Sequence, residues 1–187
     1  MKPEEVENEN KINGGILPFT ESVLKKFKKN SNLLSIGEIE QNVYLIVSGI
    51  VEVGLFVDNE DKIIEFVLPN EFTSSLSSIL TQQPSDVYLK CLTDCEIRVI
   101  SFAKLRETAK TSLEASQAYV GAIEKAYVQR VKREKDFLTL TAEERYIKLM
   151  ETRPEIIKLI PIFRIAKYIG IHPDSLSRIR KTKFMNG

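Results

Sequence analysis

Residues 165–181 read IAKYIGIHPDSLSRIRK, and this stretch predicts two short helices joined by a tight turn. Apolar side chains at helical spacing give the first helix one apolar face, made of Ile162, Ile165, Ala166 and Ile169. Gly170 permits a sharp turn after it, with Ile171 beneath, and Pro173 can open the next helix with its fixed φ.

The second helix of this stretch also separates apolar from polar side chains. Leu176 and Ile179 would point toward the first helix. The opposite face, at spacings of i, i+3, i+4 and i+7, carries Asp174, Ser177, Arg178 and Lys181. We interpret the stretch as a helix-turn-helix whose second helix faces outward. The alternative is a small helical hairpin that only packs on the rest of the chain.

The outward face has the chemistry of a major-groove reader. Arg178 can donate two hydrogen bonds to O6 and N7 of guanine, and Asp174 can accept one from N4 of cytosine. Ser175 and Ser177 can each reach a base or a phosphate. We therefore predict base contacts from these four residues. The predicted phosphate contacts, which position the protein without reading sequence, are Arg164, Arg180, Lys181 and Lys183.

The distribution of charge along the chain favours a polyanionic partner. The whole chain has a net charge of +1, yet residues 1–100 carry 9 Lys and Arg against 16 Asp and Glu, a net of −7. Residues 161–187 carry six basic side chains against Asp174 alone, a net of +5. A charge run is more often a solvated face, but this asymmetry between the ends favours double-stranded DNA as the partner of the basic end.

Composition indicates a globular protein of the cytoplasm. Of the 187 residues, 43% are hydrophobic, which is enough for a core. No apolar run approaches the roughly 20 residues of a membrane span, and the acidic start MKPEEVENEN does not resemble a signal peptide. Two cysteines, Cys91 and Cys95, do not form a disulfide framework in a chain of this size.

The first half of the chain predicts mostly strands. After a polar lead-in over residues 1–16, residues 19–30 predict a short helix, with Thr20 as its N-cap and Val23, Leu24 and Phe27 on one face. Alternating apolar residues and turn signals then predict about seven short strands, among them 43–47, 51–55, 63–68, 87–92 and 96–101. We expect an α+β fold in which residues 17–112 form an antiparallel, jelly-roll-like β-roll flanked by helices.

From residue 102 the pattern becomes helical. A short helix over 102–111 precedes a long one over 113–138, which contains no proline. Apolar residues at a and d positions, interrupted by polar ones, predict a dimerisation helix with contacts from Val120, Ile123 and Tyr127. The alternative is that this stripe packs on the chain's own β-domain.

A separate helical domain is expected over residues 139–187. Thr141 and Glu144 have the spacing of a capping box, which predicts the start of a new helix there. This domain would hold the helix-turn-helix. Only KTKFMNG follows Arg180, so either the domain lacks a full wing or the wing lies beyond this sequence.

The order of these elements resembles the cyclic-AMP receptor protein and fumarate-nitrate-reduction regulator (Crp/Fnr) family over about residues 17–181. YLIVSGIVEV, at 44–53, resembles the family's strand–Gly–strand signature, and LTDCEIRVIS, at 92–101, its last β-roll strands. The most specific likeness is that of 165–181 to its helix-turn-helix. The resemblance implies a cyclic-nucleotide-binding β-roll, a dimerisation helix and a DNA-binding domain in a cytoplasmic transcription regulator. RNA polymerase is a further candidate partner.

One departure from the family concerns its phosphate-binding cassette, a Gly-Glu pair followed by an Arg. Alignment of NEFTSSLSSILTQQPSDV, at 70–87, places Ser74 and Ser75 at the Gly-Glu positions and Ser85 or Asp86 at the Arg. Without arginine the phosphate loses its main partner, so we do not expect cyclic AMP to bind. The degenerate ligand cassette comprises Glu71 and these four residues, and its serines could still hold a different effector, whose identity is unknown.

Other classes of function find little support in the sequence. Cys91, Cys95 and the lone His172 are too few for a zinc or iron–sulfur site, and we expect the thiols to be buried and structural. The strand region has no His for a metal oxygenase, and no P-loop or Rossmann pattern is present. We therefore expect no metal, no cofactor and no enzymatic activity.

The sequence thus predicts a homodimeric, sequence-specific DNA-binding transcription regulator of the Crp/Fnr type that does not respond to cyclic AMP. A second hypothesis is an effector-binding or protein-interaction module with a β-roll that no longer reads DNA. Measured DNA affinity would separate the two.

Overall fold

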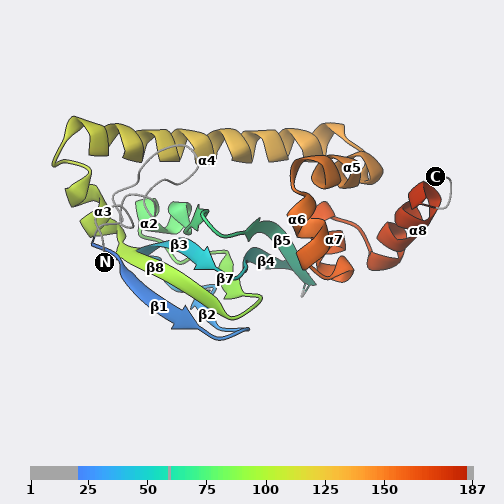
Figure 1. The fold of residues 1–187 in the computed structure, drawn as a ribbon, viewed down its shortest axis with the longest axis horizontal. Helices are drawn as coiled ribbons and strands as arrows, with labels where there is room; N and C mark the ends of the chain where they lie inside the picture. The colour runs from blue at the N-terminus through green and yellow to red at the C-terminus, as the bar shows by residue number, and fades with distance from the viewer. Residues whose placement is uncertain (1–20, 59, 185–187) are drawn as a thin grey trace, which may run out of the picture. The chain divides into compact units, whose positions relative to one another are not determined.

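The computed structural model describes residues 21–58 and 60–184, without the side chains of Lys183 and Phe184. The chain divides into two compact units, residues 1–53 with 66–128, and residues 54–65 with 129–187. The fold is α+β, as predicted: among the described residues a β-roll that includes the short helix over Leu76–Thr81 comes first, and the other helices follow it along the chain (Figure 1).

Two four-stranded sheets form the β-roll. The first has the order β1-β8-β3-β6 and consists of β1 (Val23–Phe27), β8 (Cys95–Ser101), β3 (Asn42–Ser48) and β6 (Phe72–Thr73). The second has the order β2-β7-β4-β5 and consists of β2 (Asn32–Leu34), β7 (Tyr88–Cys91), β4 (Val51–Val57) and β5 (Glu60–Val67). All five strands that the alternation predicted are confirmed, as β3, β4, β5, β7 and β8.

The core of the roll is built from side chains of both sheets. Its most deeply buried members are Ile46, Val51, Phe66, Leu89 and Ile97. Because these five come from β3, β4, β5, β7 and β8, the two sheets share one hydrophobic interior.

The helix predicted over residues 19–30 is wrong, because Val23–Phe27 form strand β1. β1 pairs with β8 in an antiparallel register that runs from Val23 opposite Val99 to Phe27 opposite Cys95. Apolar residues spaced this closely fit either a short helix or a short strand, and pairing with β8 decides between them. The N-cap predicted at Thr20 lies outside the described residues.

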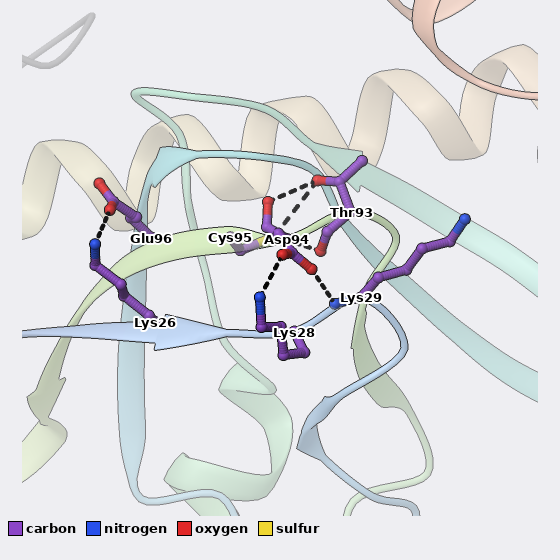
Figure 2. Close-up of polar contacts among 7 residues, drawn as sticks. All are labelled: Lys26, Lys28, Lys29, Thr93, Asp94, Cys95 and Glu96. Carbon is purple, nitrogen blue, oxygen red and sulfur yellow. Dashed lines mark hydrogen bonds and ion pairs between the residues drawn. The ribbon is translucent and has the colours of Figure 1, made fainter.

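Lysines of the β1 region form ion pairs with acidic residues at and just before β8 (Figure 2). Lys26 Nζ lies 2.9 Å from Glu96 Oε1, directly opposite it in the register. Asp94 accepts hydrogen bonds from Lys28 Nζ at 2.9 Å and from the Lys29 backbone N–H at 2.8 Å. These exposed contacts attach the edge strand at the turn before β8.

Three of the described helices belong wholly or partly to the first unit. α2 (Leu76–Thr81) lies in the Ser/Thr/Gln-rich stretch, where the sequence predicted no element. α3 (Phe102–Thr108) and α4 (Leu113–Thr139) confirm the two predicted helices. Tyr119 and Ala122 of α4 pack against a buried cluster of the roll that includes Leu45 and Ile100.

The second unit is mainly helical. Its elements are the end of α4, α5 (Ala142–Thr152), α6 (Pro154–Leu159), α7 (Ile162–Ile169) and α8 (Pro173–Phe184). The predicted capping box of α5 is confirmed, since Thr141 Oγ1 accepts from the Glu144 N–H at 3.2 Å and Glu144 Oε2 accepts from the Thr141 N–H at 2.7 Å. Residues 54–65, from the β4–β5 hairpin, also belong to this unit.

Candidate nucleic-acid interface and ligand cassette

α7 and α8, joined by a short turn, occupy the segment that the sequence predicted as a helix-turn-helix. Gly170 ends α7 in the left-handed region at φ +83°, and its N–H donates to the Ala166 carbonyl at 2.9 Å. The Ile171 N–H donates to the same carbonyl at 3.0 Å. These two bonds close the helix end, and glycine is needed there because other residues are strained at this φ.

The contact between the two helices is apolar. Ile165, Ala166 and Ile169 of α7 are buried, as is Leu176 of α8. Ile179 is half-buried. The inward face that the spacing predicted is therefore confirmed.

The outward face of α8 carries the predicted DNA-contacting residues. Asp174, Arg178, Arg180 and Lys181 are exposed, whereas Ser175 and Ser177 are half-buried. Within residues 21–58 and 60–184, no carboxylate forms an ion pair with Arg178, Arg180 or Lys181 that would neutralise this face. Lys183 lies within α8, but its side chain is outside the described structure.

The predicted contact Arg164 and the neighbouring His172 both have intramolecular partners. Arg164 is half-buried on α7, and its guanidinium carbon lies 5.4 Å from the centroid of the Phe163 ring. His172 is exposed in the turn, and its Nδ1 accepts from the Asp174 N–H at 3.3 Å. His172 therefore helps to begin α8.

Two arginines that the sequence analysis did not single out support the turn. Arg133 Nη2 donates to the carbonyls of Tyr168 at 3.0 Å and of Ile63 at 3.2 Å. Arg145 Nε donates to the Ile169 carbonyl at 3.1 Å. Both guanidinium carbons lie over the Phe137 ring, at 4.8 Å and 4.6 Å from its centroid. These contacts tie the end of α7 to α4 and α5.

The long helix α4 has one exposed apolar stripe. Val120 and Tyr127, both predicted dimer contacts, are exposed, and Ile123 is half-buried. Leu113, Val131 and Leu138 are also exposed and continue the stripe at steps of seven or four residues. Tyr119 and Ala122, outside the stripe, pack on the roll, whereas Val120 and Tyr127 of the stripe are exposed. The dimer contact of the stripe stays a prediction.

The serines of the degenerate ligand cassette form hydrogen bonds within the protein. Ser85 Oγ lies 2.9 Å from Ser75 Oγ, and both side chains are buried. Ser74 Oγ donates to the Asn42 carbonyl at 2.8 Å. The structure thus brings the predicted serines together from the start of α2 and the segment before β7.

The acidic residues assigned to the cassette do not join these serines. Glu71 Oε2 accepts from the Leu68 N–H at 2.8 Å, in the turn before β6. Asp86 is exposed beside buried Ser85. No Lys or Arg is bonded to Ser75 or Ser85 within the described residues, so the cassette offers a phosphate no cationic partner there.

The two cysteines are free and buried. A hydrogen bond with Cys95, together with burial, raises the pKa of the Cys91 thiol. Cys95 Sγ donates toward the Thr93 carbonyl at 3.3 Å and the Ile50 carbonyl at 3.5 Å. In the described part of the chain, no group of three or more His, Cys, Asp or Glu is placed to hold a metal ion.

The sequence analysis missed Glu40. Its side chain is only 1% exposed, immediately before β3, and its N–H donates to Ser78 Oγ of α2 at 3.1 Å. No local pattern marks a glutamate at this position as buried, because it is packed beside α2, which lies far from it in the sequence.

Comparison with known proteins is consistent with this geometry. Residues 24–112 match the family model of the cyclic nucleotide-binding domain. Among curated proteins, no sequence matches the chain. None of the described helices is both long and apolar enough to span a membrane.

Solved structures share the fold of the chain. The c-di-GMP-responsive global regulator CLP of Xanthomonas campestris superposes with a TM-score of 0.69 at 17% identity, over 90% of this chain and 89% of its own. FixK2 of Bradyrhizobium japonicum gives 0.73 at 16% identity, over 89% and 86%. A candidate Crp/Fnr-family transcriptional regulator of Eubacterium rectale gives 0.68 at 12% identity, over 91% and 82%. Residues 24–112 thus match a cyclic nucleotide-binding domain, and the chain has the fold of Crp/Fnr-type regulators.

Proposed function

We propose that this protein is a homodimeric, sequence-specific DNA-binding transcription regulator of the Crp/Fnr type that acts without cyclic AMP. The observation that carries the proposal is the outward face of α8. Arg178, Arg180 and Lys181 are exposed there without an acidic partner in the described residues, on a helix held by a helix-turn-helix. Such a face fits the major groove and its flanking phosphates.

The exposed stripe of α4 supports the dimer. Val120 and Tyr127 lie seven residues apart on a 27-residue helix, which is the spacing of a two-helix seam. A dimer formed along this stripe would present two copies of α8 to the same duplex. Half-sites would lie about one helical turn, roughly 34 Å, apart in a near-palindromic operator.

Loss of the cyclic AMP response is supported by the cassette. Its arginine position carries buried Ser85, which is bonded to Ser75, and exposed Asp86 follows. A cyclic phosphate approaching this segment would meet a carboxylate instead of a guanidinium. We place the protein in the cytoplasm with DNA, and with RNA polymerase as a further partner; we propose no cofactor.

The test is selection from a random duplex pool with the purified full chain at one stated salt concentration, followed by anisotropy titration of the selected duplex. We expect a near-palindromic sequence that binds at least a thousandfold, about 4 kcal/mol, more tightly than bulk DNA. Failure to enrich any sequence would contradict the proposal and favour an interaction module that no longer reads DNA.

Two variants of α8 then separate base readout from phosphate contact. Arg178→Ala should cost about 1–3 kcal/mol on the selected duplex and relax its preference at one base pair. Lys181→Ala should weaken binding to all duplexes alike and flatten the dependence of affinity on salt. Equal losses with unchanged preference in both variants would refute this division of roles.

A further inference from the structure

The carboxyl group of Glu40 is buried, and the groups bonded to it are hydrogen-bond donors without a positive charge. Its Oε1 accepts from the backbone N–H groups of Gln41 and Asn42, at 2.9 Å each, and from the Tyr44 hydroxyl at 3.2 Å. Its Oε2 has no hydrogen-bond partner within the described residues. A carboxyl buried without a cationic partner needs such donors to remain inside the fold.

The backbone of Glu40 and of the residues before it is bonded to the segment aligned with the cassette, residues 70–87. The Glu40 N–H donates to Ser78 Oγ at 3.1 Å, and Ser78 Oγ donates to the Gln83 carbonyl at 2.6 Å. The segment just before Glu40 runs along the other end of the cassette. There the Ser85 N–H donates to the Glu38 carbonyl, and the Gly37 N–H donates to the Ser85 carbonyl, both at 2.8 Å.

The electrostatics of Glu40 are set by burial and by backbone donors. Burial raises the pKa of Glu40, and hydrogen bonds from the Asn42 and Gln41 N–H groups and the Tyr44 hydroxyl lower it, as does the nearby Ser75 N–H dipole. The largest contributions to this shift come from burial and from these donors, and none of them from a Lys or Arg. Ser75 stands at the position that aligns with the glutamate of the family's cassette, so its backbone is part of the segment that would face a ligand's phosphate.

The cavity beside Glu40 is lined by acidic side chains and by no basic ones. A cavity of about 260 Å³ is lined by Glu38, Glu40 and Tyr44 among other residues, and its lining includes no Lys or Arg. Two carboxyl groups in one small hollow repel an anion and give it no partner. The hollow beside Glu40 is therefore unsuited to a nucleotide phosphate.

We propose that the Glu40 carboxyl is a built-in ligand of the β-roll: it occupies donors beside the cassette that an added anion would use, so that the roll keeps its arrangement without a bound nucleotide. The inference goes beyond the proposed function. It rests on the β-roll and its cassette and not on DNA binding, so the DNA-binding part of the proposed function can fail while this inference stands, and the acetate test can fail while DNA binding stands.

Chemical rescue tests this proposal directly. Glu40→Ala removes the CH₂–COO⁻ group, which has the size of acetate, and leaves the donors of Gln41, Asn42 and Tyr44 in place. We expect the full-length variant to melt below the wild type and sodium acetate to restore its Tm in a saturable way. A rise of about 3–6 °C is expected at tenfold excess over the dissociation constant, relative to sodium chloride of equal ionic strength.

A matched variant shows whether acetate acts through this site. Leu34 is 4% exposed and lines the same hollow, so Leu34→Ala also creates a buried cavity but removes no anion. Its Tm, and that of the wild type, should not rise with acetate beyond the chloride control. Equal rises in all three proteins, or no rise in Glu40→Ala, would overturn the proposal.

A second measurement, made on the wild type, tests the proposal even if Glu40→Ala does not fold. Cyclic AMP and cyclic GMP are added separately to the wild-type protein, and Tm is followed as the concentration increases. We expect no saturable shift, because the donors are already occupied. A saturable increase with either nucleotide would show that the cassette is open to a ligand and would refute the built-in ligand.

Discussion

The guanidinium carbon of Arg133 lies 4.0 Å from the centroid of the Tyr168 ring, and Arg133 Nη2 donates to the carbonyl of the same residue at 3.0 Å. Arg133 thus binds both the side chain and the backbone of α7 near its end. Its second hydrogen bond, to the Ile63 carbonyl, reaches the β4–β5 hairpin. One side chain therefore connects α4, the helix-turn-helix and the hairpin within the second unit.

Replacement of Arg133 should destabilise the end of α7. Arg133→Ala removes two hydrogen bonds to carbonyls and the cation–π contacts with Tyr168 and Phe137, so we expect a loss of about 1–3 kcal/mol in the free energy of unfolding. Denaturant unfolding measures this loss, and hydrogen exchange should show faster exchange of α7 amides. Arg130→Ala, an exposed position one turn earlier on α4, is the control. Equal effects of the two substitutions would contradict the role given to Arg133.

The turn of the helix-turn-helix should not tolerate a side chain at Gly170. A Cβ there would lie 3.0 Å from Phe137 Cε1, and φ is +83°. We expect Gly170→Ala to cost about 1–2 kcal/mol of stability. Gly121→Ala, inside α4 with no atom near the added Cβ, should instead stabilise by about 0.5–1 kcal/mol. Thermal unfolding tests this: Tm should fall in Gly170→Ala and rise in Gly121→Ala.

Stability should depend on pH through Glu40. Because burial raises the pKa of Glu40 above its ordinary 4.5, the folded state holds this proton more tightly than the unfolded chain does. The resulting stabilisation is fully present below pH 4.5 and is lost as the pH rises through the folded-state pKa. The free energy of unfolding of the wild type should therefore fall relative to that of Glu40→Gln as the pH is raised above 4.5. If the difference in the free energy of unfolding between the two proteins does not change with pH, the pKa of Glu40 is not raised in the folded state.

A charge on the exposed stripe of α4 should disrupt the proposed dimer. Tyr127 is 67% exposed, and Tyr127→Glu would place two carboxylates in an apolar seam. We expect the dimer dissociation constant to rise at least tenfold, about 1.4 kcal/mol, in sedimentation equilibrium. Gln129→Glu, nearly opposite on the same helix, is the control and should leave the dimer intact. A Tyr127→Glu dimer as tight as the wild type would exclude this stripe as the interface.

Features set by local chemistry could be read from the sequence. The capping box needs only Thr141 and Glu144 three residues apart, and the turn of the helix-turn-helix needs Gly170 between two apolar faces. The inward and outward faces of α8 follow from helical periodicity alone. These interactions join residues within one or two helical turns, so their spacing along the chain is enough to predict them.

Features that join distant segments were decided by the tertiary structure. Residues 23–27 form a strand because they pair with β8, although the spacing of their apolar residues also fits a helix. Glu40 is buried beside α2, where its N–H donates to Ser78 Oγ, a residue distant in the sequence. Phe137 lies between Arg133 and Arg145 only because α4 and α5 bring the two guanidinium groups to one ring. Such partners are chosen by packing across the fold, and no pattern in a short window of sequence records that choice.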